Sequence, residues 1–311
     1  MSVGGVDHAL GLTFMPPADG FLGLDGDTAP RDARAVIIPF GLEATVSYGG
    51  GTAAGPAAII AASHEVETFD DVLWCEAVER YGVATLVEPD IASPVAAALD
   101  QLAGLVDAVL QRGRFPLVLG GEHSITAGAI RPFVARHPSL AVLHFDAHAD
   151  LRDGYAGEHY SHAAALRRVL DHPQVDTLVS VGIRNISRGE IPFLEAQRDR
   201  IHIHWGRDKR RYDVEQIVAP LVGRAIYVTF DVDGFDASLM PSTGTPEPGG
   251  LFWDDVMPII AAAARVGRIV GADVNELAPI AGLRGPDFVA AKLVYRILNE
   301  ALIGGRASAG A

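Results

Sequence analysis

Residues 140–150 read LAVLHFDAHAD, and the fold class is best argued outward from this stretch. Its first six residues form a mostly apolar run with the length of a strand that is buried on both faces. In the extended backbone that follows, Asp146, His148 and Asp150 leave on the same side, because successive side chains alternate. The stretch therefore predicts a buried strand whose carboxyl end presents metal-ligand side chains.

Strand-like and helix-like patterns alternate along most of the chain. Helical patterns at 57–68, 95–111, 256–265 and 287–302 separate apolar runs, which predicts a parallel sheet with right-handed crossovers. The pattern leaves a closed barrel and an open three-layer sheet as alternatives, and both place chemistry at the carboxyl ends of strands. Eight strands are predicted, at residues 35–40, 83–87, 115–119, 140–145, 177–182, 201–204, 225–230 and 268–274.

Two other predicted strands also end in metal-ligand residues. Strand 115–119 is followed by the sequence GGEHS (120–124), and strand 225–230 by DVDGFD (231–236). If these ends meet, two imidazoles and four carboxylates converge, which is too many ligands for one catalytic ion and suits two divalent cations. Oxygen ligands with some imidazole and no thiolate favour a hard ion such as Mn²⁺ over structural Zn²⁺. The predicted ligands are His123, Asp146, His148, Asp150, Asp231 and Asp233.

These motifs resemble the signatures of the ureohydrolases, the family of arginase and agmatinase. The resemblance continues at residues 243–250 (TGTPEPGG) and 273–279 (DVNELAP) and so spans most of the chain in the same order. It implies an open α/β/α three-layer fold with an eight-stranded parallel sheet. It also implies a dinuclear Mn²⁺ centre, two ions per chain, that hydrolyses a guanidinium group to urea and an amine.

The resemblance assigns each predicted ligand a role. His123 and Asp150 would hold one ion, His148 and Asp233 the other, while Asp146 and Asp231 would bridge the two. Two cations can lower the pKa of a water enough to make it a nucleophile at neutral pH. Glu122 and Asp273 are interpreted as residues that orient neighbouring groups rather than as ligands.

Two further residues are predicted to act on the substrate. His162 lies where this family keeps a histidine that shuttles protons, as the leaving amine requires, and His159 is its rival. Glu276 matches the carboxylate that holds the guanidinium, since a planar, forked cation calls for a bidentate acceptor.

The guanidine that is cut depends on the loop after the DAHAD motif. Residues 151–159 resemble the loop of bacterial and archaeal agmatinases and lack the Asn and Ser/Thr set by which arginases hold an amino acid. Agmatine, giving putrescine for polyamine biosynthesis, is therefore the expected substrate, with Asp153 or Glu158 receiving its distal ammonium. Arg152 would suit an anionic tail if it pointed inward. Guanidinobutyrate, aminopropyl-agmatine, guanidine and arginine stay open as alternatives.

Two other classes of function stay open. A deacetylase on the same general fold would use a single Zn²⁺, but such a site has no need of His123, Asp150 and Asp233. A non-catalytic metal-binding relative is disfavoured because the predicted ligands and Glu276 are all present. Counting bound metal and testing urea release would separate these classes.

The composition limits which partners and which cellular compartment are expected for this protein. The 311 residues carry 25 Lys and Arg against 39 Asp and Glu, a net charge of −14, so binding to nucleic acid through a basic face is not expected. Such a charge can attract cationic substrates, but more often it only keeps a protein in solution. The single cysteine, Cys75, the lack of a secretory signal and the lack of a membrane span predict a cytoplasmic protein. We predict an N-terminal arm over residues 1–34 and one domain over 35–311. The resemblance implies a homo-oligomer, a trimer or a hexamer.

Overall fold

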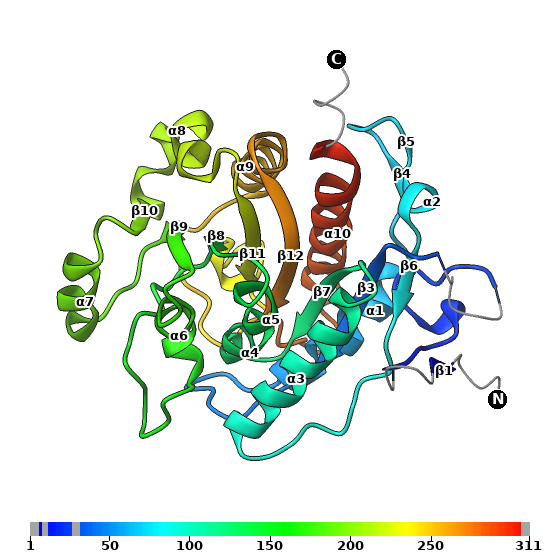
Figure 1. Cartoon of the computed structure of the whole chain (residues 1–311), viewed down its shortest axis with the longest axis horizontal. Helices are drawn as coiled ribbons and strands as arrows, with labels where there is room; N and C mark the ends of the chain where they lie inside the picture. The colour runs from blue at the N-terminus through cyan, green and yellow to red at the C-terminus, as the bar shows by residue number, and fades with distance from the viewer. Residues whose placement is uncertain (1–5, 8–11, 27–31, 306–311) are drawn as a thin grey trace.

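The computed structural model describes residues 6–7, 12–26 and 32–305. Its centre is a sheet of eight parallel strands with helices on both faces, so the fold is the open α/β/α arrangement and not a barrel (Figure 1). The spatial order is β10-β9-β8-β11-β12-β7-β3-β6. Their bounds are Ala35–Phe40 (β3), Val83–Thr85 (β6), Phe115–Gly120 (β7), Leu140–Phe145 (β8), Val175–Ile183 (β9), Ile201–Trp205 (β10), Ala225–Asp231 (β11) and Arg268–Asn275 (β12).

The helices cover the two faces of this sheet. On one face α3, α4, α5 and α6 pack on the sheet, and on the other α1, α8, α9 and α10 do so. Short helices α2 and α7 complete the set. The bounds are Gly55–Ser63 (α1), Ala77–Tyr81 (α2), Val95–Leu110 (α3), Thr126–Ala129 (α4), Arg131–Val134 (α5), Ala165–Leu170 (α6), Ile191–Ala196 (α7), Val214–Val218 (α8), Trp253–Val266 (α9) and Gly285–Asn299 (α10).

Two hydrophobic layers result, one on each face of the sheet. In β3, Ala35 and Ile37 join the layer under α1 and α10, while Val36 and Ile38 join the layer under α3. All four are fully buried, which explains why the strands read as continuous apolar runs rather than as alternating ones. Burying a valine or isoleucine side chain contributes about 1.5–3 kcal/mol, so these two layers are the main source of stability.

The strand order brings distant motifs together. β8, β11, β12 and β7 are consecutive neighbours in the sheet and run in the same direction. Their carboxyl ends therefore lie side by side, although they are separated by as many as 155 residues of sequence between Gly120 and Asn275. The last residue of β11 and the segments that follow β7, β8 and β11 contain every predicted metal ligand.

The N-terminal residues that the structure describes pack on the far edge of the sheet. Leu12, Phe14 and Phe21 are buried, and the Phe21 amide donates to Thr85 Oγ1 at 2.9 Å. This segment therefore contributes to the hydrophobic core. Part of the predicted arm, residues 1–5, 8–11 and 27–31, lies outside the described residues, and the division at residue 34 stays a prediction.

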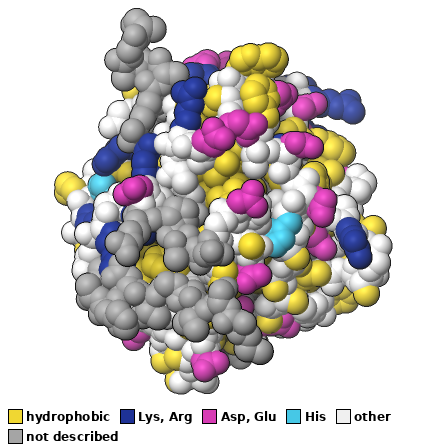
Figure 2. All heavy atoms as spheres, turned by 90° about the vertical axis from the view of Figure 1, so that its right-hand side faces the viewer, with side chains coloured by type: hydrophobic (Ala, Val, Ile, Leu, Met, Phe, Trp, Pro, Cys, Tyr) yellow, Lys and Arg dark blue, Asp and Glu magenta, His cyan; other side chains and the backbone are white. Residues whose placement is uncertain are grey.

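The face that carries β4 (Phe69–Asp70) and β5 (Cys75–Glu76) has a mixed surface. Acidic side chains are interspersed there with hydrophobic and uncharged ones (Figure 2), as is ordinary for a globular protein. Trp74 is 77% exposed and packs edge to face against Phe69. None of the helices in the described part of the chain combines the length and the apolar character that crossing a bilayer demands.

Candidate metal centre and active site

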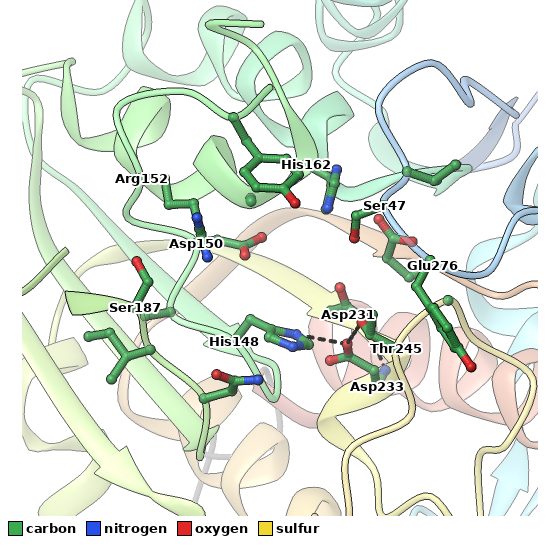
Figure 3. A pocket seen from close by; sticks show the side chains of 18 of the residues that line it. Ser47, His148, Asp150, Arg152, His162, Ser187, Asp231, Asp233, Thr245 and Glu276 are labelled. Carbon is green, nitrogen blue, oxygen red and sulfur yellow. Dashed lines mark hydrogen bonds and ion pairs between the residues drawn. The ribbon is translucent and has the colours of Figure 1, made fainter. Parts of the chain in front are cut away.

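A cavity of about 180 Å³ lies beyond the carboxyl ends of the sheet. His148, Asp150, Asp231 and Asp233 line it together with His162 and Glu276, and Glu276 lies beside Asp231 (Figure 3). The cavity thus has the size of a small molecule and is lined by four of the six predicted ligands and by both predicted catalytic residues.

The structure brings all six predicted ligands together, and we call this group the metal-ligand cluster. His123 Nδ1 lies 3.2 Å from Asp146 Oδ2, 3.1 Å from Asp150 Oδ2 and 3.5 Å from Asp231 Oδ2. His148 Nδ1 lies 2.9 Å from Asp233 Oδ2 and 3.5 Å from Asp146 Oδ1. Both imidazoles therefore face carboxylates through Nδ1, and Asp146 is the carboxylate that lies near both of them. The roles of the six residues stay predictions.

The tautomer of His123 shows why this cluster suits a cation. His123 Nε2 lies 2.8 Å from Thr229 Oγ1, whose hydroxyl donates to Asp273 Oδ1 at 2.6 Å. Since that hydroxyl has one proton, it accepts from His123, and Nε2 carries the ring proton. Nδ1 is then the ring atom that faces the carboxylate oxygens, and it is buried and without a hydrogen-bond partner. A divalent cation between them satisfies all these lone pairs, so the donor set fits a metal.

The pKa values indicate the same excess of negative charge. Burial raises the pKa of Asp231 well above its ordinary value, and the charges of Asp233, Asp146 and Glu276 raise it further. Burial lowers the pKa of His148, but Asp233 and Asp146 outweigh burial and raise it. The cluster by itself therefore favours taking up positive charge, which bound cations would supply.

Residues behind the ligands hold them in place. Asp146 Oδ2 lies 2.9 Å from Nε2 of the buried His144, whose Nδ1 lies 3.0 Å from Ser180 Oγ. Asp273, interpreted from the sequence as an orienting residue, accepts from Tyr227, Thr229 and Asn275 and acts on His123 only through Thr229. The sequence analysis did not single out His144, although it precedes Asp146 by two positions and so shares its side of the strand.

The backbone at the site takes conformations that few residues adopt. Asp150 has a φ of 51° and Glu276 a φ of 67°, both in the left-handed region. Such strain persists where the surrounding structure imposes it, and it often marks a functional site. Gly121 is explained by a different constraint, since a Cβ there would clash with the Leu42 backbone.

Glu276 occupies a buried position beside the cluster. Its side-chain Oε1 accepts from the His123 amide at 2.6 Å, and its own amide donates to Gly121 O at 2.7 Å. Burial raises the pKa of Glu276 to about 8, although the hydrogen bond from His123 lowers it. A cation that arrives in the cavity would favour its charged form, as binding of a guanidinium requires.

The structure separates the two candidate histidines. His162 lines the cavity, and its Nδ1 lies 3.0 Å from Thr45 Oγ1. His159 is exposed, packs against the Tyr160 ring, contacts Arg168 and is not among the residues that line the cavity. Position alone therefore favours His162 over His159.

Of the three residues expected near the tail of the substrate, only Arg152 lines the cavity, where its guanidinium lies 4.9 Å from the centre of the Tyr155 ring. Asp153 is instead 74% exposed in its side chain and pairs with Arg168 at 2.7 Å. Glu158 accepts from the Tyr160 amide at 2.9 Å, within its own loop. Neither carboxylate reaches the cavity, because local partners hold both of them.

The sequence analysis missed several residues of the cavity wall. They come from the loop after β3 and the segment after β9, whose strands also end at this edge of the sheet. Buried Glu190 accepts from the amides of Leu151 and Ser187, so it ties two of these segments together. The sequence feature that could have identified these residues is their position after a predicted strand. The missed residues include Val46, Ser47, Tyr48, Asn185, Ile186, Ser187 and Glu190.

Comparison with known proteins agrees with this geometry. The model of the arginase family matches residues 33–299. The chain belongs to the arginase family. The N(1)-aminopropylagmatine ureohydrolase of Synechocystis sp. is 32% identical over 287 residues, which cover 90% of this chain and 92% of that protein. The agmatinase of Bacillus anthracis is 33% identical over 258 residues, which cover 80% of this chain and 85% of that protein.

A solved structure of the arginase family supports the fold directly. The agmatine ureohydrolase of Thermoplasma volcanium superposes with a TM-score of 0.78 at 29% identity, covering 87% of this chain and 90% of that one. Members of this family are hydrolases of guanidino carbon–nitrogen bonds, so the prediction of such a hydrolase is confirmed. The family depends on a dinuclear metal centre, and the metal-ligand cluster provides donors of the required kind.

Proposed function

We propose that this protein hydrolyses a guanidinium compound to urea and an amine with two Mn²⁺ ions per chain. The observation that carries the proposal is the buried Nδ1 of His123, which has no hydrogen-bond partner and faces three buried carboxylates beside a cavity lined by Glu276 and His162. A deacetylase with one Zn²⁺ leaves this excess of ligands unexplained.

The six residues of the metal-ligand cluster would hold the ions. His123 and Asp150 serve one of them, His148 and Asp233 the other, and Asp146 and Asp231 both. Bound there, divalent cations lower the pKa of water and so supply the nucleophile. His144 and the Thr229–Asp273 pair keep the ligands oriented, as conserved outer partners do in metal sites generally.

Glu276 and His162 act on the organic substrate. The Glu276 carboxylate binds the guanidinium and holds its carbon toward the metal-ligand cluster. Attack on that carbon gives a tetrahedral intermediate, and urea forms when the bond to the amine nitrogen breaks. His162 supplies the proton that this nitrogen takes up as the amine leaves.

Agmatine is the proposed substrate, with putrescine and urea as products. Support comes from the resemblance of loop 151–159 to agmatinases and from the relatives named agmatinase and agmatine ureohydrolase. The Synechocystis relative makes N(1)-aminopropylagmatine a rival of the same charge type. Arg152 in the cavity wall favours a second candidate, a guanidino acid such as guanidinobutyrate, because its cation suits an anionic tail.

The test is a panel of guanidines given to Mn²⁺-loaded protein, with urea release and bound metal measured on the same sample. The panel contains agmatine, aminopropyl-agmatine, guanidinobutyrate, arginine and guanidine. We expect two metals per chain and the highest kcat/KM for agmatine. Glu276→Gln is the matched control, which should keep its metal and lose turnover. Release of urea from arginine alone would overturn the agmatine assignment, and release from none of them would overturn the proposal.

We further propose that the protein is a cytoplasmic homo-oligomer, a trimer or a hexamer. The family resemblance supports the oligomer, and the single, buried Cys75 supports a reducing compartment. Light scattering of the purified protein should give three or six times the mass of one chain, and the mass of a single chain would contradict the oligomer.

A further inference from the structure

The hydroxyl of Thr45 lies between a buried carboxylate and the histidine of the cavity. Thr45 Oγ1 donates to Glu122 Oε1 at 2.9 Å and lies 3.0 Å from His162 Nδ1. It also accepts from the His162 backbone amide at 2.9 Å. One hydroxyl therefore contacts the carboxylate, the imidazole and the backbone of the same histidine.

These three contacts determine where the protons are. A threonine hydroxyl has one proton and two lone pairs. Its proton goes to Glu122, which is an acceptor here because it also accepts from the amides of Ala44 and Thr45 and from the Ser124 hydroxyl. Both lone pairs of Thr45 then accept from His162, one from the amide and one from Nδ1. Nδ1 of His162 must carry the ring proton, and Nε2 is left for the cavity.

We propose that Thr45 and Glu122 are positioning residues for His162. They hold its ring in one orientation and in the Nδ1–H tautomer, so that Nε2 is the atom that exchanges a proton with the reacting nitrogen. This inference rests on the proposed function, in which His162 protonates the leaving amine. It adds the residues that decide which ring nitrogen does so.

The Glu122 carboxylate is itself held firmly in place. Glu122 is fully buried at the end of β7, directly before His123, and its hydrogen bonds to Ala44 and Thr45 fasten the loop after β3 to that strand end. These contacts therefore position His162 relative to the strand end that also carries the metal ligand His123. Glu122 was expected to orient a metal ligand, but the hydroxyls that donate to it are those of Thr45 and Ser124.

A second histidine of the site has the same arrangement. His123 Nε2 contacts the Thr229 hydroxyl, which donates to Asp273, and the opposite ring nitrogen faces the metal-ligand cluster. At both histidines a threonine hydroxyl donates to a buried carboxylate and accepts from the ring nitrogen that faces away from the cavity. In His162 the nitrogen so bound is Nδ1, and in His123 it is Nε2.

The first experiment compares Thr45→Val with Thr45→Ser in the Mn²⁺-loaded enzyme. Valine keeps the shape and removes the hydroxyl, so kcat should fall about tenfold to a hundredfold with KM within about threefold, because a misplaced proton donor slows only the chemical step. Serine restores the hydroxyl and should restore kcat to within about threefold of wild type. The matched control is Thr85→Val, which removes a buried hydrogen bond to Phe21 far from the cavity and should leave kcat unchanged.

A double-mutant cycle tests whether Thr45 acts through His162. His162→Ala alone should lower kcat by about 10²–10⁴-fold while bound metal stays at the wild-type level. In the His162→Ala background, Thr45→Val should cause no further loss beyond about twofold, since nothing remains to be positioned. Losses that multiply across the two substitutions would overturn the inference.

A spectroscopic readout separates positioning from a general structural role. In histidine-¹⁵N protein loaded with diamagnetic Mg²⁺, the long-range ¹H–¹⁵N spectrum reports which nitrogen of His162 is protonated, with His162→Asn to assign the signal. We expect the Nδ1–H pattern in wild type and Thr45→Ser and its loss in Thr45→Val. An Nε2–H pattern in wild type would overturn the inference while urea release stood. If wild type releases no urea from any guanidine, the proposed function fails. The spectrum still tests, independently of activity, whether Thr45 and Glu122 hold His162 in the Nδ1–H tautomer.

Discussion

Two buried polar clusters in this molecule differ in how the negative charge of their carboxylates is balanced. One is the metal-ligand cluster. The other, the Asp70 network, lies where β4, α2 and α10 meet and consists of Asp70, Tyr81, Arg296, Asn299 and Glu300. Both are buried and rich in carboxylates, but only the Asp70 network has a permanent cation of its own.

The members of the Asp70 network satisfy one another's charges and hydrogen bonds. Arg296 pairs with Asp70 through one arm of its guanidinium and with Glu300 Oε1 at 2.6 Å through the other. Asn299 donates to Asp70 at 2.7 Å and accepts from Tyr81 at 2.7 Å. Each donor has an acceptor within the protein, so the network has no need of an outside partner.

In the metal-ligand cluster, by contrast, the ion-pair partners of the carboxylates in the described part of the chain are imidazoles. His123 faces them with Nδ1, a buried nitrogen without a hydrogen-bond partner, because its Nε2 is bound to Thr229. The comparison teaches that an incomplete polar cluster in a well-packed core indicates a ligand, whereas a complete one indicates structure.

The largest expected effect distinguishes the clusters by metal. Asp231→Asn should lower urea release by about a thousandfold or more and reduce bound Mn²⁺, because losing a bridging carboxylate removes several kcal/mol of electrostatic stabilisation. In EDTA the same variant should melt at a higher temperature than wild type, since one buried like charge is gone. Metal analysis and thermal unfolding with and without EDTA test both signs. The control is Asp236→Asn, a carboxylate of the same segment that accepts only from Ser238, Gly249 and Gly250 and should keep its metal.

The next effect is on stability alone. Arg296→Met removes the cation of the Asp70 network and leaves two buried carboxylates without it, which should cost about 3–5 kcal/mol of unfolding free energy. The loss should be the same with Mn²⁺ and with EDTA, and metal content should not change. Urea denaturation measures the change, and Lys292→Met on the same helix should cost at most about 1 kcal/mol. A loss that disappears on adding metal would contradict the separation of the two clusters.

The smallest effect depends on pH. Burial raises the pKa of Asp70, but hydrogen bonds from Leu73 and Asn299 and the charge of Arg296 outweigh burial and bring the pKa below 3.8. A carboxyl whose folded pKa is below its unfolded pKa stabilises the fold at pH values above about 4, and this stabilisation is lost as the pH falls through the folded value. The stability difference between wild type and Asp70→Asn should therefore shrink between pH 6 and pH 2. Asp71→Asn, the same change at an exposed neighbour, is measured alongside as the control, and a difference between wild type and Asp70→Asn that is independent of pH would refute the prediction.

Much of the site could be predicted because its signals are local. The spacing of Asp146, His148 and Asp150 directly after a buried strand predicted that all three reach the same end of the sheet, and they do so although Asp150 adopts a left-handed rather than an extended conformation. The tail contacts could not be predicted in this way. Asp153 looked available in the sequence, but Arg168, fifteen residues later, holds it outside the cavity.

By itself, the amino-acid sequence determined the eight strands of the central sheet and the ligand types at the ends of three of them, since apolar runs and alternation are properties of neighbouring residues. The family resemblance predicted that the sheet is open, which the structure confirms, and only the tertiary structure decided that β8, β11, β12 and β7 lie side by side. It also decided that Thr45 meets His162 across 117 residues. The physical reason is that strand order and hydrogen bonds between distant loops follow from how the whole chain packs, which no local pattern encodes.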